Sequence, residues 1–214
     1  MLAEPSSVTH CFSAAQVRAL DRYAIEYQGL PGIRLMKRAG RFAFEQIMQA
    51  WPHTRRLLVL CGGGNNGGDG FIVAALARQR GIPVKLWAMT EKADLSGDAS
   101  LAADFAVEAG VSIEQVNLSD IDACFAGLGE DELASETIVV DALLGTGLKG
   151  FVRDEYARVI RAVNRSGFPV LAIDIPSGLC SDTGANLGEI VKADLTTTFV
   201  GVKRGLLTHL GPEY

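Results

Sequence analysis

Residues 61–70 read CGGGNNGGDG, between the apolar run LLVL at 57–60 and a second run, FIVAALARQR, at 71–80. Six of these ten residues are glycine, which a chain tolerates where its backbone takes unusual dihedral angles or comes very close to another group. Gly62, Gly64 and Gly67 match the G-x-G-x-x-G pattern at the place between a strand and a helix where dinucleotide-binding proteins have it. The first amide groups of that helix would then face a phosphate.

The same stretch has a simpler interpretation. The glycine pattern alone is a weak signal, and no Lys-Ser or Lys-Thr pair follows it as in a P-loop. A tight Asn-Gly turn, with Asp69 capping the helix, would explain Asp69 equally well. It explains less well why Asn65 and Asn66 stand side by side among so many glycines.

Apolar strand patterns alternate with helical patterns along most of the chain. We expect helices over 13–27, where Ser13 and Gln16 suggest a capping box, and over 33–50, 70–80, 97–110, 121–128 and 155–167. We expect strands over 56–60, 83–89 and 111–116, strands leading into loops over 137–147 and 169–178, and a last strand over 195–202. This alternation predicts an α/β fold, a Rossmann-like three-layer α/β/α sandwich with a mostly parallel central sheet, in which residues 1–214 form one domain.

The composition argues against nucleic-acid-binding, membrane-spanning and secreted proteins. A net charge of −5 argues against a nucleic-acid-binding surface, and no apolar stretch approaches the length of about 20 residues that spans a bilayer. The first residues, MLAEPSSVTHCF, lack the basic and apolar regions of a signal peptide. Four cysteines without C-x-x-C spacing predict reduced thiols in a cytoplasmic protein, with Cys61 as a buried core residue rather than a nucleophile. We therefore expect neither a nucleic acid nor a membrane as partner.

Two further strand ends carry polar residues. VVDALLGTGLKG at 139–150 places Asp141 before a glycine-containing loop, and IDIPSGL at 173–179 places Asp174 and Ser177 on either side of Pro176. Taken singly, an acid at such a position is more often a hydrogen-bonded loop anchor than a ligand.

Taken together, the three strand ends suggest a site. The carboxyl ends of parallel strands meet at one edge of the sheet, so Asp69, Asp141 and Asp174 would crowd there and raise one another's pKa. A cation would relieve the repulsion. Asn66, Asp141 and Ser177 offer oxygen ligands, which favour a hard cation over zinc or copper. A carboxylate left beside a bound substrate would then be suited to proton transfer.

These motifs, in this order, resemble the YjeF N-terminal domain family, the NAD(P)HX epimerases. GNNGGDG at 64–70, VDALLGTGL at 140–148 and DIPSG at 174–178 match its three signature segments. GLPGIRLMKRAG at 29–40 resembles its N-terminal helix motif, and TTTFVGVKRGLLT at 196–208 its last strand, so the resemblance runs from about Phe12 to Thr208. Lys37 departs from the pattern, since many members have an acid there, and we assign it no site role.

The resemblance implies an isomerase that interconverts the R and S epimers of NADHX or NADPHX. These damaged cofactors carry a hydroxyl at C6 of the reduced ring. Two routes for the reaction at C6 are compatible with the sequence: direct epimerisation, or loss and return of water. The resemblance also implies one potassium ion per subunit, held by Asn66, Asp141 and Ser177. We expect Asp174 to be the catalytic acid/base. The substrate-binding residues implied are Asn65, Asn66, Gly67, Gly68, Asp69, Gly145, Thr146, Gly147, Leu148, Lys149, Gly150, Phe151 and Asp174.

Members of the family are commonly homodimers to which the N-terminal helices contribute. In several bacteria the domain is fused ahead of an ADP- or ATP-dependent dehydratase that accepts only the S epimer. Because the chain stops at Tyr214 without an obvious terminating element, we expect either a part of such a fusion or a trimmed stand-alone enzyme.

Two other functions compete with the epimerase. An NAD-dependent dehydrogenase would explain the first loop but leaves GTGLKG at 145–150 and DIPSG at 174–178 without a role. A non-catalytic Rossmann-like binding or scaffold module would be expected to lose the acidic and asparagine positions. All of them are present, so the sequence favours the epimerase.

Overall fold

The computed structural model describes residues 10–214. The expectation that the chain has no signal peptide rests on residues 1–12, and most of these lie outside the described residues. Its centre is a six-stranded sheet of β2 (Arg56–Cys61), β3 (Val84–Ala88), β4 (Ile113–Gln115), β5 (Thr137–Ala142), β6 (Val170–Ile173) and β7 (Leu195–Thr197). Every pair of neighbouring strands in this sheet is parallel, and the spatial order is β4-β3-β2-β5-β6-β7. This is the strand order of the Rossmann fold. Strands β3 and β4 are added on one side of β2, and strands β5, β6 and β7 are added on the other side.

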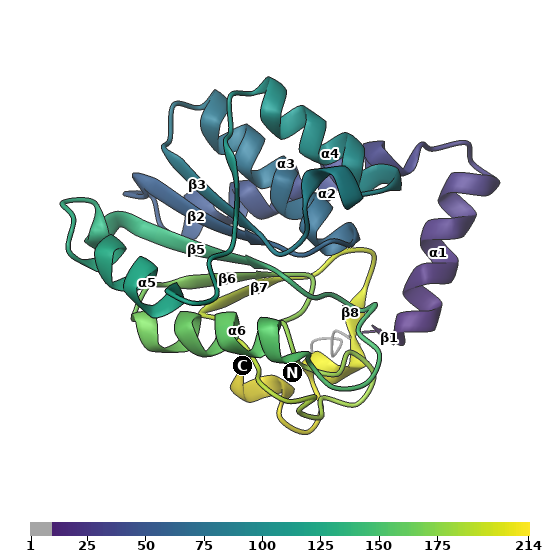
Figure 1. Cartoon of the computed structure of the whole chain (residues 1–214). Helices are drawn as coiled ribbons and strands as arrows, with labels where there is room; N and C mark the ends of the chain where they lie inside the picture. The colour runs from purple at the N-terminus through teal and green to yellow at the C-terminus, as the bar shows by residue number, and fades with distance from the viewer. Residues whose placement is uncertain (1–9) are drawn as a thin grey trace, which may run out of the picture.

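Helices cover both faces of the sheet (Figure 1). α2 (Gly32–Ala50), α3 (Asn65–Gln79) and α4 (Gly97–Glu108) lie on one face, and α5 (Ile121–Gly129) and α6 (Asp154–Ser166) lie on the other. Side chains alternate along a strand. In β2, therefore, Leu57 and Val59 pack with the first group of helices, whereas Leu58 and Leu60 pack with the second. The expected three-layer α/β/α sandwich with a parallel sheet is confirmed.

Cys61 ends β2 with no exposed surface, and burial raises the pKa of its thiol well above the usual value. The expectation of a core thiol is confirmed. Within residues 10–214, no helix has the length and apolar character that a bilayer span requires.

The glycine-rich stretch differs from its expected form. α3 begins at Asn65, five residues before the expected start, with Gly64 at the position that precedes the helix. Asp69 therefore lies in the second turn, beyond the reach of the unpaired amide groups at the helix start. The interpretation of Asp69 as a helix cap is wrong, and no Asn-Gly turn is present in this stretch.

Most of its glycines serve close packing. A Cβ on Gly67 would stand 1.9 Å from the carbonyl oxygen of Gly62, and one on Gly70 would stand 2.5 Å from the Cβ of Ala142 in β5. Only glycine lets the start of α3 lie this close to the ends of β2 and β5. Gly64 is different, because a Cβ there would meet no atom within 4 Å.

The last expected strand is divided in two. β7 ends at Thr197, and β8 (Val202–Lys203) pairs in parallel with β1 (Cys11–Phe12) outside the main sheet. Between them Val200 has a φ of 64°, in the left-handed region that a β-branched residue rarely adopts. This turn breaks the strand and carries Lys203 back toward the end of β6.

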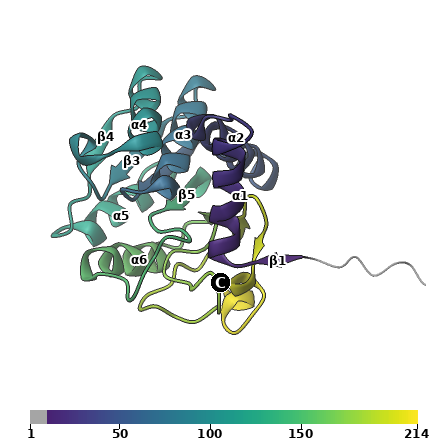
Figure 2. The ribbon, with the colours of Figure 1, turned by 90° about the vertical axis from the view of Figure 1, so that its right-hand side faces the viewer.

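α1 (Ala14–Glu26) begins with the expected capping box, in which Gln16 N donates to Ser13 Oγ and Ser13 N donates to Gln16 Oε1. The helix stands apart from the three layers, along the edge where β5 and β6 end (Figures 1 and 2). Arg18 Nη1 donates to the carbonyl oxygen of Thr146 at 3.3 Å and so connects α1 to the loop after β5.

Candidate functional site

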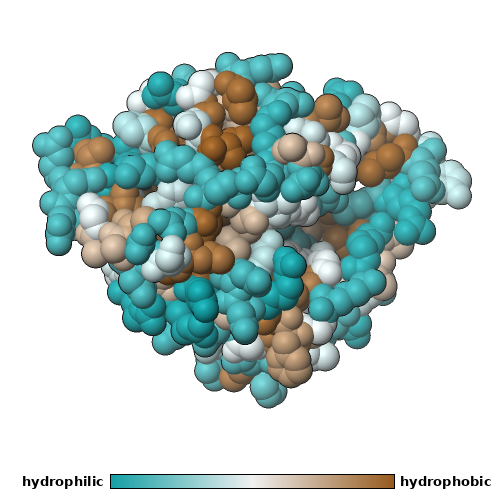
Figure 3. All heavy atoms as spheres, viewed as in Figure 1, coloured by the Kyte–Doolittle hydropathy of each residue, from teal (hydrophilic) through white to brown (hydrophobic). Residues whose placement is uncertain are grey.

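A cavity of about 800 Å³ opens at the carboxyl edge of the sheet, beside the point where the strand order reverses. Its walls come from α1, α2, the start of α3, the loops after β5 and β6, and the turn before β8. Figure 3 shows the hollow between α1 and the body of the sandwich. All three signature segments of the sequence lie at this edge.

The first segment contributes Gly63, Gly64, Asn65, Asn66 and Asp69 to the cavity wall. Gly67 and Gly68 were also expected to bind substrate, but they are buried behind this wall and do not line the cavity. Because no side chain caps the start of α3, its first amide groups remain available to an anionic ligand such as a phosphate.

The second segment forms the opposite wall. Its lining residues are Gly145, Thr146, Gly147, Leu148, Lys149 and Phe151, whereas Gly150, also expected, is outside the lining. A Cβ on Gly145 would stand 3.1 Å from atoms of the Asn66 side chain, so the two segments meet where Gly145 faces Asn66. Phe151 is 79% exposed and is therefore open to contact with a bound molecule.

Asp141 lies beneath this surface and is completely buried with Ser177. Its Oδ1 accepts hydrogen bonds from Ser177 Oγ at 2.6 Å and Leu143 N at 3.2 Å, and its Oδ2 accepts one from Ser177 N at 2.8 Å. Leu144 N in turn donates to Ser177 Oγ. Asp141 thus ties the loop after β5 to the loop after β6, and burial raises its pKa to about 6.

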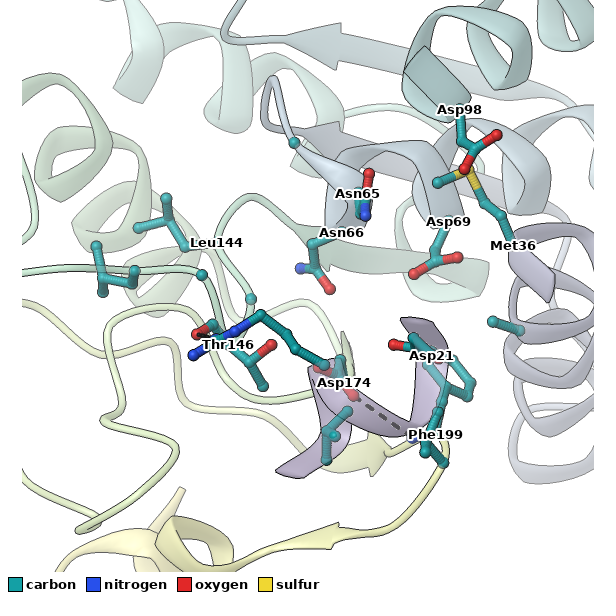
Figure 4. A pocket seen from close by; sticks show the side chains of 18 of the residues that line it. Asp21, Met36, Asn65, Asn66, Asp69, Asp98, Leu144, Thr146, Asp174 and Phe199 are labelled. Carbon is teal, nitrogen blue, oxygen red and sulfur yellow. Dashed lines mark hydrogen bonds between the residues drawn. The ribbon is translucent and has the colours of Figure 1, made fainter. Parts of the chain in front are cut away.

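Asp174 faces the cavity directly (Figure 4). Its backbone has a φ of 68°, and its Oδ1 forms an ion pair with Lys203, whose side chain has no exposed surface. The Lys203 ammonium also donates to Thr198 Oγ1 at 3.0 Å and to the carbonyl oxygen of Phe199 at 2.8 Å. These contacts fix the position of the Asp174 carboxylate.

Asp69 and Asp21 complete an acidic cluster with Asp174, and Figure 4 shows the three carboxyl groups directed toward one space. Burial, then the charges of Asp174 and Asp21, raise the pKa of Asp69 well above its usual value. Burial, followed by the charge of Asp174, also raises the pKa of Asp21. The crowding expected at this edge is therefore present, but Asp21 takes the place that was expected for Asp141.

Sequence reasoning missed Asp21 and Lys203. Asp21 gave no signal, because it is one of several polar residues on the first helix and only the chain path brings it to the cavity. The sequence did contain a signal for Lys203, because this charged residue lies inside the strand-like run TTTFVGVKRGLLT. Lys37, which departs from the family pattern, is outside the cavity lining and places its ammonium 4.2 Å from the centre of the Phe105 ring.

The donor set around Asn66 is compatible with a hard cation. Asn66 Nδ2 is buried and has no hydrogen-bond partner within residues 10–214. Amide oxygen and nitrogen are assigned by their hydrogen bonds, so turning this amide would place its oxygen in the same buried space. Among residues 10–214 there is no group of three or more His, Cys, Asp or Glu side chains arranged to hold a metal ion.

Known proteins are similar to this chain in sequence or in fold. Residues 32–205 match the family model described as YjeF-related protein N-terminus. The chain is 42% identical over 190 residues to the NAD(P)H-hydrate epimerase of Rhodopirellula baltica, covering 89% of this chain and 74% of that protein. It is 35% identical over 204 residues to the NAD(P)H-hydrate epimerase of Limosilactobacillus fermentum, covering 94% of this chain and 91% of that protein.

A longer relative is the bifunctional NAD(P)H-hydrate repair enzyme Nnr of Coxiella burnetii, which is 39% identical over 207 residues. The match covers 97% of this chain but spans only 40% of that relative's length. Among solved structures, the crystal structure of yeast ynu0 matches with a TM-score of 0.78 at 17% identity, over 92% of this chain and 82% of that one. At this identity the likeness concerns the fold.

Proposed function

This chain belongs to the family of YjeF-related protein N-terminal domains, and we propose that it is an isomerase that interconverts the R and S epimers of NADHX or NADPHX. The relatives from Rhodopirellula baltica and Limosilactobacillus fermentum are named as NAD(P)H-hydrate epimerases. One structural observation supports the same activity in this chain: the three signature segments meet at one cavity, together with a carboxylate suited to proton transfer.

The cavity offers suitable groups to two parts of such a substrate, a phosphate and the reacting ring. The open start of α3 suits a phosphate, and the segment Gly145–Phe151 adds backbone groups and the Lys149 ammonium. Asp174, held beside Lys203, is the acid/base group that we assign to the reacting ring. The loops after β5 and β6, together with α1, line the cavity that would receive the substrate.

The direct test is chromatographic separation of the R and S epimers. Starting from purified R-NADHX and, separately, R-NADPHX, the protein should bring the mixture to its equilibrium ratio much faster than buffer alone. Heat-denatured protein is the control. Equal rates with native and denatured protein would refute the proposed activity, and the faster of the two substrates would give the cofactor preference.

The proposal includes one potassium ion per subunit, held by Asn66, Asp141 and Ser177. The amide nitrogen of Asn66, which has no hydrogen-bond partner within residues 10–214, and the oxygen atoms of Asp141 and Ser177 support it. When bound, the ion would supply positive charge beside the carboxylate at the end of β5. Replacing potassium by a large inert cation such as tetramethylammonium should lower activity and the melting temperature together. Unchanged values of both would refute the potassium site.

The proposal also includes a homodimer formed through α1. The exposed apolar residues of this helix are Leu20, Tyr23 and Ile25, and the exposed Tyr27 follows its last turn. The Tyr23 and Tyr27 rings stack with centroids 5.3 Å apart. A second copy of the chain is the partner that would cover this face. Light scattering should give a dimer for the wild type and a monomer for Tyr23→Ser/Tyr27→Ser. A matched change on α4, Leu101→Ser, removes an exposed apolar side chain elsewhere and should leave the dimer intact.

A dehydratase completes the proposed repair. The Coxiella burnetii relative is named as bifunctional, which supports a second activity that acts on the product of the first, either on the same polypeptide or on a separate one. We propose an ADP- or ATP-dependent dehydratase that consumes the S epimer. We place the protein in the cytoplasm, where NADH and NADPH are used, and the lack of a disulfide at Cys61, Cys124 and Cys180 supports this location.

A further inference from the structure

The acidic cluster of the cavity is unevenly neutralised. Lys203 forms its ion pair with Asp174, whereas Asp21 and Asp69 form no ion pair within residues 10–214. Asp69 extends from the second turn of α3 and Asp21 from α1, and both point into the cavity (Figure 4). One carboxyl group of the cluster thus forms an ion pair with a buried ammonium, and within residues 10–214 the other two form none.

The surroundings of Asp174 and Asp69 act in opposite directions on the ionisation of their carboxyl groups. An adjacent buried ammonium favours the ionised form of a carboxylate, whereas burial and facing carboxylates favour the protonated form of a carboxyl group. Burial and the charges of Asp174 and Asp21 act on Asp69 in this direction, and only Lys203 opposes them. The other charged side chains that line the cavity are Arg18, Arg38, Asp98, Lys149 and Arg153, and none of them contributes to the shift at Asp69.

Such a division of states suits a reaction that needs an acid and a base at once. We propose that Asp69, with Asp21 as its positioning residue, donates the proton with which the C6 hydroxyl leaves as water, while Asp174, paired with Lys203, accepts a proton from the water that returns. This inference rests on the proposed epimerase function and extends it by assigning the proton donor and the route at C6.

The proposed step balances without any redox change. C6 is bonded to the ring nitrogen, whose lone pair forms a C6–N double bond as the C6–O bond breaks. The leaving oxygen takes its proton from Asp69 and departs as water. Water then adds to the other face of the planar C6, the C6–O bond forms again, the electron pair returns to nitrogen, and Asp174 takes the released proton. Transfer of this proton back to Asp69 through water restores the starting state.

The fixed backbone around Asp174 supports its separate role. Its left-handed conformation and the bonds of Lys203 to Thr198 and Phe199 hold the carboxylate in one place. Asp69 has no such restraint from a cation. The same residue type is therefore present in two different electrostatic environments in one cavity, which is the arrangement found where acid and base roles are divided.

Isotope labelling tests the route. In water enriched in ¹⁸O, the S epimer formed from R-NADHX by the wild-type protein should carry ¹⁸O at C6, as measured by mass spectrometry at times when the uncatalysed change is negligible. Retention of the original oxygen in the enzymatic product would overturn the leaving-water step. A wild-type protein that does not interconvert the epimers at all would instead overturn the proposed function, and this inference with it.

Substitution tests the donor. Asp69→Asn should lower kcat by roughly 10²–10⁴-fold, with a smaller change in KM, because an amide keeps the size and polarity of the side chain but supplies no acidic proton. Asp104→Asn is the matched control, since this exposed residue of α4 lies outside the cavity lining and should leave kcat unchanged. An active wild type together with an Asp69→Asn variant within a few-fold of it would overturn the assignment while the epimerase function stands.

A pH profile tests Asp21, because a merely structural role would not shift it. Activity needs protonated Asp69 and should fall as pH rises through the pKa of that group. Asp21→Asn removes a negative charge that raises this pKa, so the fall should begin at lower pH than in the wild type. An unchanged alkaline limb in a folded Asp21→Asn protein would overturn the positioning role.

Discussion

The ends of β5 and β6 look alike in the sequence but differ in the structure. Each has an aspartate after a run of apolar residues and before a loop that contains glycine. Asp141, at the end of β5, is fully buried and accepts three hydrogen bonds from neutral donors. Asp174, just beyond β6, faces a cavity, pairs with a buried lysine and has left-handed backbone.

This difference separates an anchor from a reactive group. Every donor around Asp141 belongs to one of the two loops that it joins, so its hydrogen bonds stabilise the shape of the site. Asp174 combines access to the cavity with a strained backbone conformation, and Val200 nearby is strained in the same way. Backbone strain of this kind is concentrated at functional sites. The structure therefore places a buried carboxylate that joins two loops at the end of β5 and a cavity-facing carboxylate, the reactive group of our proposal, just beyond the end of β6.

The largest expected effect is that of Asp174→Asn on catalysis. We expect epimerisation to fall by roughly 10²–10⁴-fold, because the amide cannot exchange a proton as a carboxylate does. The protein should still fold, since asparagine tolerates positive φ and keeps an oxygen that accepts from Lys203.

The matched variant is Asp141→Asn, the same chemical change at the neighbouring strand end. Its main effect should be a lower melting temperature, with a smaller loss of turnover. Chromatographic rates and thermal unfolding of the two variants in parallel decide the outcome. Equal losses of turnover would end the distinction between anchor and reactive group.

The next effect is that of Asp141→Ala on stability. Removing the carboxylate leaves Ser177 N, Ser177 Oγ and Leu143 N without their acceptor in a buried place. Because an unsatisfied buried group costs roughly 1–3 kcal/mol, we expect a loss of about 3 kcal/mol in the free energy of unfolding. For a chain of this length the melting temperature should then fall by about 6–12 °C. A fall of less than about 2 °C, under the same relation, would contradict the role of Asp141 as an anchor.

A smaller effect is expected for Ser177→Ala. This change removes the hydroxyl that donates to Asp141 and accepts from Leu144 N, and we expect a loss of about 1–2 kcal/mol. Denaturant unfolding measures it. The control is Ser166→Ala near the end of α6, where a hydroxyl bonds Val163 and Phe168 far from the cavity. Ser166→Ala should lower stability without affecting turnover, whereas Ser177→Ala should lower both.

The smallest effect is that of Val200→Gly. Left-handed backbone costs a non-glycine residue about 1–2 kcal/mol, while the extra freedom of glycine in the unfolded chain costs about 0.5–1 kcal/mol. We therefore expect a gain in stability of no more than about 1.5 kcal/mol. Val84→Gly, at the start of β3 where the backbone is extended, is the comparison and should destabilise. A Val200→Gly protein that is destabilised as much as Val84→Gly would show that no strain is stored in this turn.

The ends of helices and strands show how far sequence patterns reach. The hydrophobic pattern placed the six strands of the sheet, because a strand that is buried on both faces is a nearly continuous apolar run such as RLLVL. It misplaced the start of α3, since Gly67, Gly68 and Gly70 disfavour a helix locally. Contacts of Gly67 and Gly70 with the ends of β2 and β5 favour the helix instead. It also missed the division of the last strand, which depends on the pairing of β8 with β1 at the other end of the chain.

The candidate site was predicted in the same uneven way. The signature segments identified Asn65, Asn66, Asp69, Asp174 and most of Gly145–Phe151 as cavity residues. They also included Gly67, Gly68 and Gly150, which do not line the cavity, because a linear motif does not separate residues that face a ligand from those that allow close packing.

The sequence by itself determined the α/β class, the strand ends with polar residues and the family, because these depend on residue types and their order along the chain. Only the tertiary structure decided which aspartate is an anchor and which faces the cavity, and it alone brought Asp21 and Lys203 to Asp69 and Asp174. The physical reason is that ionisation depends on burial and on charges a few ångströms away. Those neighbours come from α1 and β8, which lie far from the site in sequence and meet it only when the chain is folded.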